Sequence, residues 1–109
     1  MQPSILITGG AKRIGSVIAR AFGQAGWHIV LHYGQSREAA EGLAATLPSA
    51  ETVSCDLADS DAAVAMVEAL AERLPDWRVL VNCAAVFRND SALALDPATF
   101  AEAMTVNAL

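Results

Sequence analysis

The chain has 109 residues, of which 54% are hydrophobic and 17% are charged, and this composition indicates a globular domain with a sizeable core. Its formal net charge of −5 argues against a nucleic-acid partner, because affinity for nucleic acids depends largely on clustered cations. No apolar run approaches the roughly 20 residues that span a bilayer and no basic leader precedes the first apolar run, so neither a membrane partner nor secretion is predicted.

The first predicted element is a short strand from Ser4 to Thr8, an aliphatic run of the kind that is buried on both faces of a parallel sheet. It stops at Gly9. Apolar residues then recur at steps of three and four, which predicts a helix with one apolar stripe ending at a C-cap at Gly26. The residues of that stripe are Ile14, Val17, Ile18, Ala21, Phe22 and Ala25.

The same pattern then repeats along the chain. Three more strands are predicted, at Trp27–Tyr33, Glu51–Cys55 and Arg78–Asn82. Three more helices are predicted: one capped by Ser36 and ending near Leu47, one capped at 59–61 and ending before Pro75, and one that opens at Asp96 and Pro97.

A helix lies between each successive pair of strands, so the sheet should be parallel, with right-handed crossovers that cover both faces. We therefore expect an α/β fold, a doubly wound parallel sheet with about four strands. No linker or low-complexity segment divides residues 1–109, which should form one unit. The last helix carries no stop signal before Leu109, and we expect an N-terminal portion of a longer domain.

The turn after the first strand has the properties of a phosphate site. Gly9 and Gly10 allow backbone torsions and a close ligand approach that a Cβ would obstruct. The helix that opens near Arg13 presents unpaired N–H groups and the positive end of its dipole. In a doubly wound sheet this turn is the usual pyrophosphate site, so a dinucleotide is the predicted ligand.

In this turn and in several later segments the sequence resembles the short-chain dehydrogenase/reductase family, whose fold is a Rossmann-type sheet. The family pattern T-G-x-x-x-G-x-G is matched at Thr8, Gly9 and Gly15, with Arg13 in place of the middle glycine. The resemblance continues at Asp56-Leu57, at "NCAA" (82–85) and at Asn107.

The resemblance implies roles for these positions. Asp56 should meet the adenine amino group with the Leu57 backbone beside it, although Asp56 also suits a turn or helix N-cap. Asn82 and Ala84 should line the adenosine and ribose side, and Asn82 also suits a tie between strands. Asn107 should hold a water of the family's proton relay, which makes it the one predicted catalytic residue, unless it is simply a polar residue within a helix.

The end of the second strand bears on the choice between nicotinamide cofactors. NAD-selective sites place an acid there to accept hydrogen bonds from the ribose 2′-hydroxyl. Here "LHYGQSR" has no acid before Glu38, so NADP(H) is predicted, with Lys12 or Arg13, Ser36 and Arg37 as candidates to bind the 2′-phosphate. Arg37 equally suits a solvated surface position. The predicted cofactor-binding residues are Thr8, Gly9, Lys12, Arg13, Ile14, Gly15, His32, Tyr33, Ser36, Asp56, Leu57, Asn82, Cys83 and Ala84.

Within the family, "TGGAKRIG", "LHYGQS" and an aromatic shortly after "NCAA" look like the pteridine reductase branch. That likeness implies reduction of a pterin- or dihydrofolate-type C=N bond, with Arg13, Ala85 and Phe87 at the substrate and Phe87 stacked on the pterin ring. Phe87 also suits a packed loop residue, and Ala85 stands where the branch often has serine. "FRND" (87–90) resembles the 3-oxoacyl carrier-protein reductases, which keeps a keto-reductase as an alternative. A non-catalytic NAD(P)-sensing protein is a second alternative.

The family's proton donor is a tyrosine in a Y-x-x-x-K motif, which Tyr33, the only tyrosine, does not match. We therefore expect the 109-residue segment alone to show no turnover. By resemblance the full-length protein should be a homo-dimer or homo-tetramer acting on a small molecule. Cys55 and Cys83 are too few and too far apart for a disulfide framework or a CxxC metal site, so we expect reduced thiols, no metal and a cytoplasmic protein.

Overall fold

A computed structural model of the chain describes residues 2–11 and 13–83. In this part of the chain four strands form one parallel sheet in the order β3-β2-β1-β4. The strands are β1 (Ser4–Thr8), β2 (His28–Tyr33), β3 (Ala50–Ser54) and β4 (Trp77–Asn82). The predicted strands are thus confirmed to within one residue at each end.

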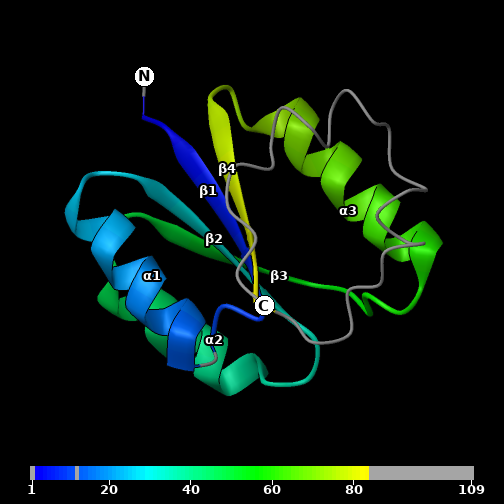
Figure 1. The fold of residues 1–109 in the computed structure, drawn as a ribbon, viewed down its shortest axis with the longest axis horizontal. Helices are drawn as coiled ribbons and strands as arrows, with labels where there is room; N and C mark the ends of the chain where they lie inside the picture. The colour runs from blue at the N-terminus through cyan, green and yellow to red at the C-terminus, as the bar shows by residue number, and fades with distance from the viewer. Residues whose placement is uncertain (1, 12, 84–109) are drawn as a thin grey trace.

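Three helices cover the sheet in the described residues: α1 (Arg13–Gln24), α2 (Arg37–Thr46) and α3 (Ser60–Arg73). Helices α1 and α2 lie on one face and α3 lies on the other (Figure 1). This arrangement confirms the predicted doubly wound α/β sheet. The helix predicted from Asp96 lies outside the described residues.

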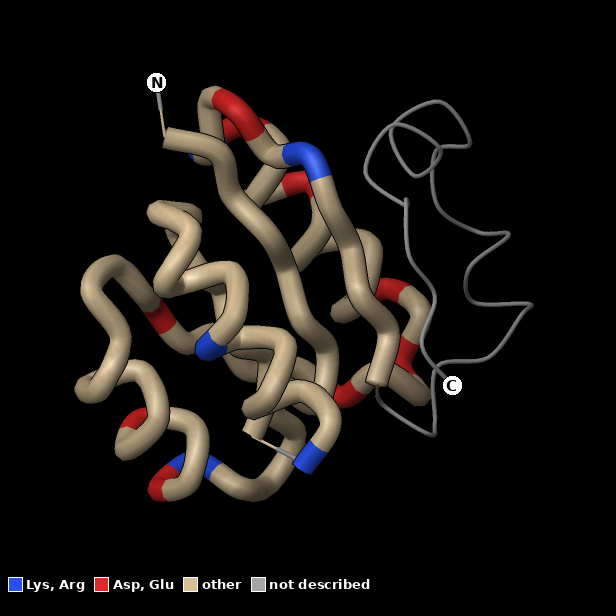
Figure 2. The backbone as a smooth tube through the Cα atoms, turned by 60° about the vertical axis from the view of Figure 1, so that its left-hand side comes forward, with Lys and Arg blue, Asp and Glu red and all other residues tan. Residues whose placement is uncertain are grey.

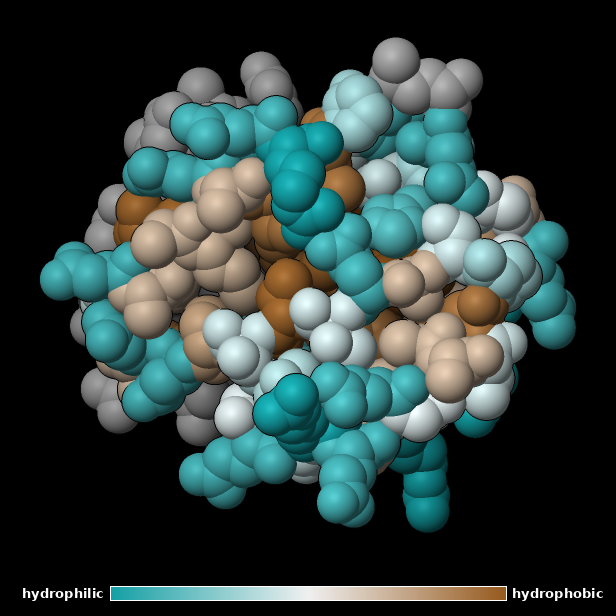
Figure 3. Space-filling model, turned by 180° about the vertical axis from the view of Figure 1, so that it is seen from behind, coloured by the Kyte–Doolittle hydropathy of each residue, from teal (hydrophilic) through white to brown (hydrophobic). Residues whose placement is uncertain are grey.

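The core has one layer on each face of the sheet, because successive side chains of a strand point to opposite faces. Ile5 and Ile7 of β1 pack on the side of α1 and α2, whereas Leu6 packs with Leu70 and Leu74 on the side of α3. All of β1 is buried, as its aliphatic run predicts. Strand β3 is half-buried and forms the edge of the sheet farthest from β4. Seen from behind, the surface of the molecule shows hydrophobic residues between hydrophilic ones (Figure 3).

The predicted apolar stripe is wrong for four of its six residues. Ile14 and Val17 are 58% and 61% exposed, Ala21 is exposed as well, and Ala25 is exposed just beyond the end of α1. The buried residues of α1 are instead Gly15, Ala19 and Gly23, flanked by Ile18 and Phe22 at the margin of the core. Small residues let the helix axis lie close to its neighbours. At Gly23 the neighbour is Leu47, at the end of α2, and a Cβ on Gly23 would stand 3.2 Å from Leu47 Cδ2.

The predicted caps have different outcomes. Asp59 is confirmed as the N-cap of α3, because its carboxylate accepts hydrogen bonds from the amides of Asp61 (3.1 Å) and Ala62 (3.2 Å). Ser36 occupies the N-cap position of α2, but its side chain makes no capping hydrogen bond. Gly26 after α1 has φ of 93°, the left-handed conformation expected of a C-cap glycine.

None of the helices within residues 2–11 and 13–83 has the length and apolarity needed to cross a membrane. The same residues contain no group of three or more histidine, cysteine, aspartate or glutamate side chains placed to hold a metal ion.

Candidate functional site

The carboxyl ends of the four parallel strands meet at one edge of the sheet. Gly9 and Gly10 follow β1, His32 and Tyr33 end β2, Cys55 follows β3 within one residue, and Asn82 ends β4. Thr8 and Asn82 are directly paired in the strand register. The topology therefore brings together residues that lie up to 74 positions apart in the sequence.

The glycine turn is packed directly against the start of α1. Gly9 has φ of 63°, a left-handed conformation that favours glycine. A Cβ at Gly10 would stand 2.7 Å from Leu31 Cδ2 and 3.1 Å from the Ile7 carbonyl oxygen. A Cβ at Gly15 would stand 2.9 Å from both Gly10 Cα and the Gly9 carbonyl oxygen. Only bare backbone fits at this crossing of turn and helix.

The first turn of α1 carries no acidic side chain. Its leading N–H groups are those that any helix leaves without an intrahelical partner, and they carry the positive end of the helix dipole. An anion such as a phosphate is the ligand that suits this end of the helix.

Thr8 and Asn82 lock β1 to β4 at this edge. The Thr8 hydroxyl donates to Asn82 Oδ1 over 2.8 Å, and the Cys83 amide donates to the Thr8 carbonyl over 3.1 Å. Both side chains are buried. Asn82 thus ties β1 to β4, which is one of the two roles that the sequence suggested. Its contact with a cofactor stays a prediction.

His32 joins three of the four strand ends. Its side chain is buried, and Nδ1 accepts a hydrogen bond from the Gly9 amide over 3.2 Å while Nε2 donates to the Cys55 carbonyl over 2.9 Å. Burial lowers the pKa of His32, and the bond to the Cys55 carbonyl opposes that shift only in part. Both ring nitrogens are therefore occupied by backbone groups, and the ring is held neutral.

The chain after β3 forms a turn in which Asp56 Oδ1 accepts a hydrogen bond from the Ala58 amide over 2.9 Å. The side chain of Asp56 is exposed, and that of Leu57 is buried against Ala63. Burial and then the charges of Asp56 and Asp59 raise the pKa of the Cys55 thiol, so this cysteine stays protonated near neutral pH.

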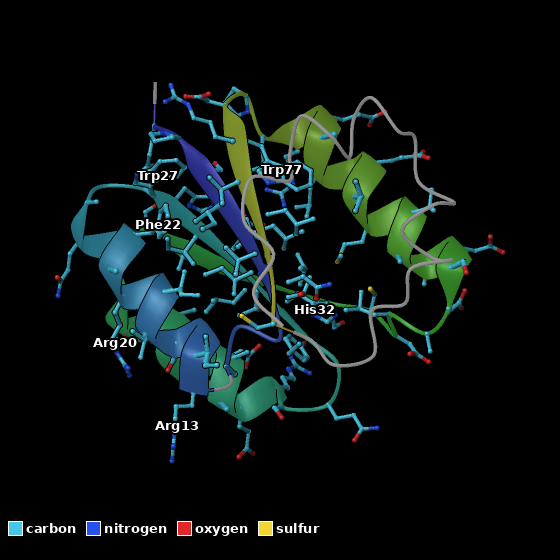
Figure 4. All side chains as sticks on the ribbon, viewed as in Figure 1. Arg13, Arg20, Phe22, Trp27, His32 and Trp77 are labelled. Carbon is cyan, nitrogen blue, oxygen red and sulfur yellow. The ribbon has the colours of Figure 1, made fainter. Side chains whose placement is uncertain are left out.

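Two of the predicted phosphate-binding cations, Arg13 and Arg37, are on the surface. Arg13 is exposed and extends from the start of α1 away from the sheet, whereas His32 lies among the strand ends (Figure 4). Figure 2 shows Lys and Arg in blue and Asp and Glu in red spread along the described part of the backbone. Arg37 is also exposed, and its Nε donates to Glu41 Oε2 over 3.2 Å. Ser36 is exposed and Tyr33 is half-buried.

Five predicted site residues lie outside the described residues: Lys12, Ala84, Ala85, Phe87 and Asn107. Conversely, two groups at this edge are absent from the predicted cofactor-binding residues, although Gly10 was named as part of the phosphate turn. Gly10 contacts both β2 and α1, and its signal was the glycine pair itself. The Cys55 carbonyl is a backbone group, so no residue pattern could have indicated its bond to His32.

Comparisons with known proteins agree with this geometry. Residues 3–109 match the family model described as short chain dehydrogenase. Acetoacetyl-CoA reductase of Paracoccus denitrificans is 29% identical over 107 residues, which are 98% of this chain and 44% of that protein. Pteridine reductase 1 of Leishmania tarentolae is 47% identical over 62 residues, which are 52% of this chain and 22% of that protein.

Among solved structures, acetoin dehydrogenase YohF from Salmonella typhimurium superposes with a TM-score of 0.67 at 26% sequence identity. The match covers 74% of this chain and 34% of that one. The chain thus spans less than half the length of each of these proteins.

Proposed function

Because this chain belongs to the short chain dehydrogenase family, we propose that it is the cofactor-binding part of an NADP(H)-dependent oxidoreductase that reduces a pterin- or dihydrofolate-type C=N bond. The strongest support is the edge of the sheet where a glycine turn, a helix start without acidic residues and a strand end without an acid lie together.

The residues present fit a dinucleotide. A Cβ at Gly15 would meet the backbone of Gly9 and Gly10 at 2.9 Å, so glycine at this position lets the turn lie directly against the start of α1, as a pyrophosphate site between turn and helix requires. The pyrophosphate would be held by the first amides of α1 and by the turn that follows Thr8. When bound, a nicotinamide cofactor supplies the hydride.

The end of β2 favours the phosphorylated cofactor. A carboxylate there would repel a 2′-phosphate, and the chain has none between Leu31 and Arg37. Ser36 and Arg37 are exposed just beyond this end, and Arg13 is exposed at the start of α1. In the described contacts Glu41 accepts a hydrogen bond only from Nε of Arg37. The two terminal nitrogens of that guanidinium would therefore donate to a phosphate.

The pterin-type substrate is favoured by the relative named pteridine reductase 1, whose 47% identity is the higher of the two relatives above. Arg13 would face substrate and phosphate, and Ala85 and Phe87 would complete the substrate site. The reduction transfers hydride to the carbon of the C=N bond, and a protein acid supplies the proton to nitrogen. Asn107 would hold a water in that proton relay.

A second candidate is a keto-reductase for 3-oxoacyl thioesters. The match to acetoacetyl-CoA reductase favours it, because that match extends over 98% of the chain. The cofactor half of the site would be the same, and hydride would go to a carbonyl carbon. For either activity we propose a cytoplasmic homo-dimer or homo-tetramer.

The test is a matrix of substrates and cofactors with the full-length protein. Dihydrofolate, a dihydropterin and acetoacetyl-CoA are each offered with NADPH and with NADH, and NADPH oxidation is followed by absorbance. We expect kcat/KM to be highest for a dihydropterin-type substrate with NADPH. A clear preference for acetoacetyl-CoA would establish the keto-reductase instead. Binding of NADPH without turnover of any substrate would indicate a sensing protein, and no dinucleotide binding would overturn the proposal.

A further inference from the structure

His32 makes three hydrogen bonds that hold the glycine turn in place. Its ring Nδ1 accepts from the Gly9 amide (3.2 Å), and its backbone carbonyl accepts from the Gly10 amide (3.1 Å). Its ring Nε2 donates to the Cys55 carbonyl (2.9 Å). One residue thus orients two successive amides of the turn and ties that turn to the end of β3.

These partners fix the form of the ring. A carbonyl oxygen can only accept, so Nε2 must carry the proton, and an amide N–H can only donate, so Nδ1 must be bare. A second proton on Nδ1 would place two N–H groups against each other at Gly9. The ring is 2% exposed, so water cannot take the place of either partner without opening the structure.

We propose that the neutral ring of His32 is a positioning residue of the dinucleotide site, which sets the glycine turn for the pyrophosphate and links it to the adenine-side segment after β3. This role rests on the proposed function. It differs from the direct contact with the cofactor that the sequence predicted for His32, because both ring nitrogens already have backbone partners.

The position of Gly9 gives the ring its influence on the ligand. Gly9 holds a left-handed φ of 63° and its carbonyl oxygen abuts Gly15, so a shift of the Gly9 amide would move the turn against the first turn of α1. The Cys55 carbonyl precedes Asp56, the residue expected at adenine. Loss of the ring bonds would therefore loosen both the pyrophosphate part and the adenine part of the dinucleotide site.

Among the residues that the structure describes, few titratable groups lie on the elements around the ring. On the β3 side they are Cys55 and Asp56, on β2 the neighbour is Tyr33, and beyond the turn Arg13 is exposed at the start of α1. Thr8 and Asn82, at the ends of β1 and β4, are uncharged. Burial is the cause that lowers the pKa of His32, the bond to the Cys55 carbonyl opposes that shift, and no charged side chain of the described residues is among the causes.

The test measures the Kd of NADPH between pH 5 and 8 in the full-length protein and three variants. His32→Asn can keep an acceptor near Nδ1, His32→Leu removes both ring bonds, and His28→Asn is the matched control. His28, which is half-buried, likewise has a hydrogen bond at each ring nitrogen, but to Ser49 and Glu51 at the opposite end of β2. We expect the affinity at pH 7.5 to fall about tenfold in His32→Leu, about threefold or less in His32→Asn, and not at all in His28→Asn.

The pH profile separates positioning from simple support of the fold. The 2′-phosphate itself titrates with a pKa near 6, so the informative quantity is the ratio of wild-type to His32→Asn affinity at each pH. We expect this ratio to fall as pH drops and His32 becomes protonated. A ratio that stays constant while the ring of His32 becomes protonated would overturn the role. Absence of dinucleotide binding by the wild type at every pH would overturn the proposed function and this role together.

A measurement on the wild type alone covers the case in which His32→Leu does not fold. Nitrogen-15 NMR of the imidazole rings reports the protonation of each ring nitrogen separately. We expect His32 to remain the neutral Nε2–H form at pH 6, where an unperturbed histidine, with a pKa of about 6.5, is mostly charged. A charged ring, or a proton on Nδ1, would contradict the hydrogen bonds from which the role is inferred.

Discussion

The Thr8 hydroxyl donates a 2.8 Å hydrogen bond to Asn82 Oδ1, and this buried contact fastens the carboxyl end of β1 to that of β4. The Cys83 amide reinforces it by donating to the Thr8 carbonyl. The two residues are the last of their strands. The turn that begins at Gly9 therefore starts from a fixed point in the sheet.

Replacing Thr8 with valine should destabilise the fold, because valine keeps the shape but removes the donor and leaves Asn82 Oδ1 buried with an unmet acceptor. We expect a loss of about 1–3 kcal/mol in the free energy of unfolding, measured by urea denaturation. Thr52→Val on the half-buried strand β3 is the control and should change stability by less than about 0.5 kcal/mol. Equal losses in the two variants would show that the Thr8–Asn82 hydrogen bond makes no particular contribution to the free energy of unfolding.

Two helical glycines should respond to alanine in opposite ways. In Gly15→Ala the new methyl group would overlap the backbone of Gly9 and Gly10 at 2.9 Å, so turn and helix must move apart. We expect a loss of about 1–3 kcal/mol in stability and at least about tenfold weaker NADPH binding by calorimetry. In Gly42→Ala, on α2, the methyl group meets nothing within 4 Å. That change should raise stability by about 0.5–1 kcal/mol and leave NADPH affinity unchanged.

If Gly15→Ala bound NADPH as tightly as the wild type, the close crossing of turn and α1 would have no part in the cofactor site. If Gly42→Ala also weakened binding, the effect of Gly15→Ala would have to be assigned to general loosening of the helices rather than to the turn.

The sheet was predictable because each strand is a short apolar run bounded by glycine, proline or polar residues, and each intervening segment has helical spacing. The burial of α1 was not predictable from hydrophobicity. Its stripe of Ile14 and Val17 faces outward, while Gly15 and Ala19 are buried, and at Gly15 a Cβ would already stand 2.9 Å from the backbone of the glycine turn. Pattern reasoning ranks residues by apolarity, whereas the packing distance selected them by size.

The candidate site was predictable in its outline and less so in its detail. Thr8, Gly9 and Gly15 have sequence signals because their side chains, or the lack of them, carry the requirement. The only sequence signal for His32 was that it is a polar residue near the end of an apolar strand. Its actual bonds join the Gly9 amide and the Cys55 carbonyl, 23 residues away in either direction, and such bonds depend on strand order and not on local sequence.

Acid should destabilise the fold through Glu51, at the other end of the sheet. Arg73 binds both carboxylate oxygens of Glu51 and is the main cause that lowers the pKa of Glu51, although partial burial opposes the shift. The native state thus binds a proton at Glu51 less readily than the unfolded chain. This stability is present above the ordinary pKa of about 4.5 and is lost as pH falls through the lowered value.

The test of this contribution is a comparison of Glu51→Gln with the wild type by denaturation between pH 3 and pH 7. We expect the variant to be less stable at pH 7, by about 0.5–1 kcal/mol because the pair is partly exposed, and the difference to shrink toward pH 3. The control, Glu41→Gln, breaks the more exposed pair with Arg37 and should have no measurable effect. A difference for Glu51→Gln that stayed constant with pH would mean that its charge is not the cause.

Cofactor selectivity should reverse when an acid is placed at the end of β2. Tyr33 is the last residue of that strand and is half-buried at the edge where the strand ends meet. In Tyr33→Asp the carboxylate can accept hydrogen bonds from a ribose 2′-hydroxyl and would repel a 2′-phosphate. We expect the ratio of NADPH to NADH affinity to fall at least about tenfold, with NADPH weakened more than NADH, as measured by calorimetry at fixed salt concentration. Tyr33→Asn is the matched control, because it makes the same truncation without the charge and should leave the ratio near its wild-type value. If both variants shifted the ratio equally, the missing acid at this strand end would not be what favours the phosphorylated cofactor.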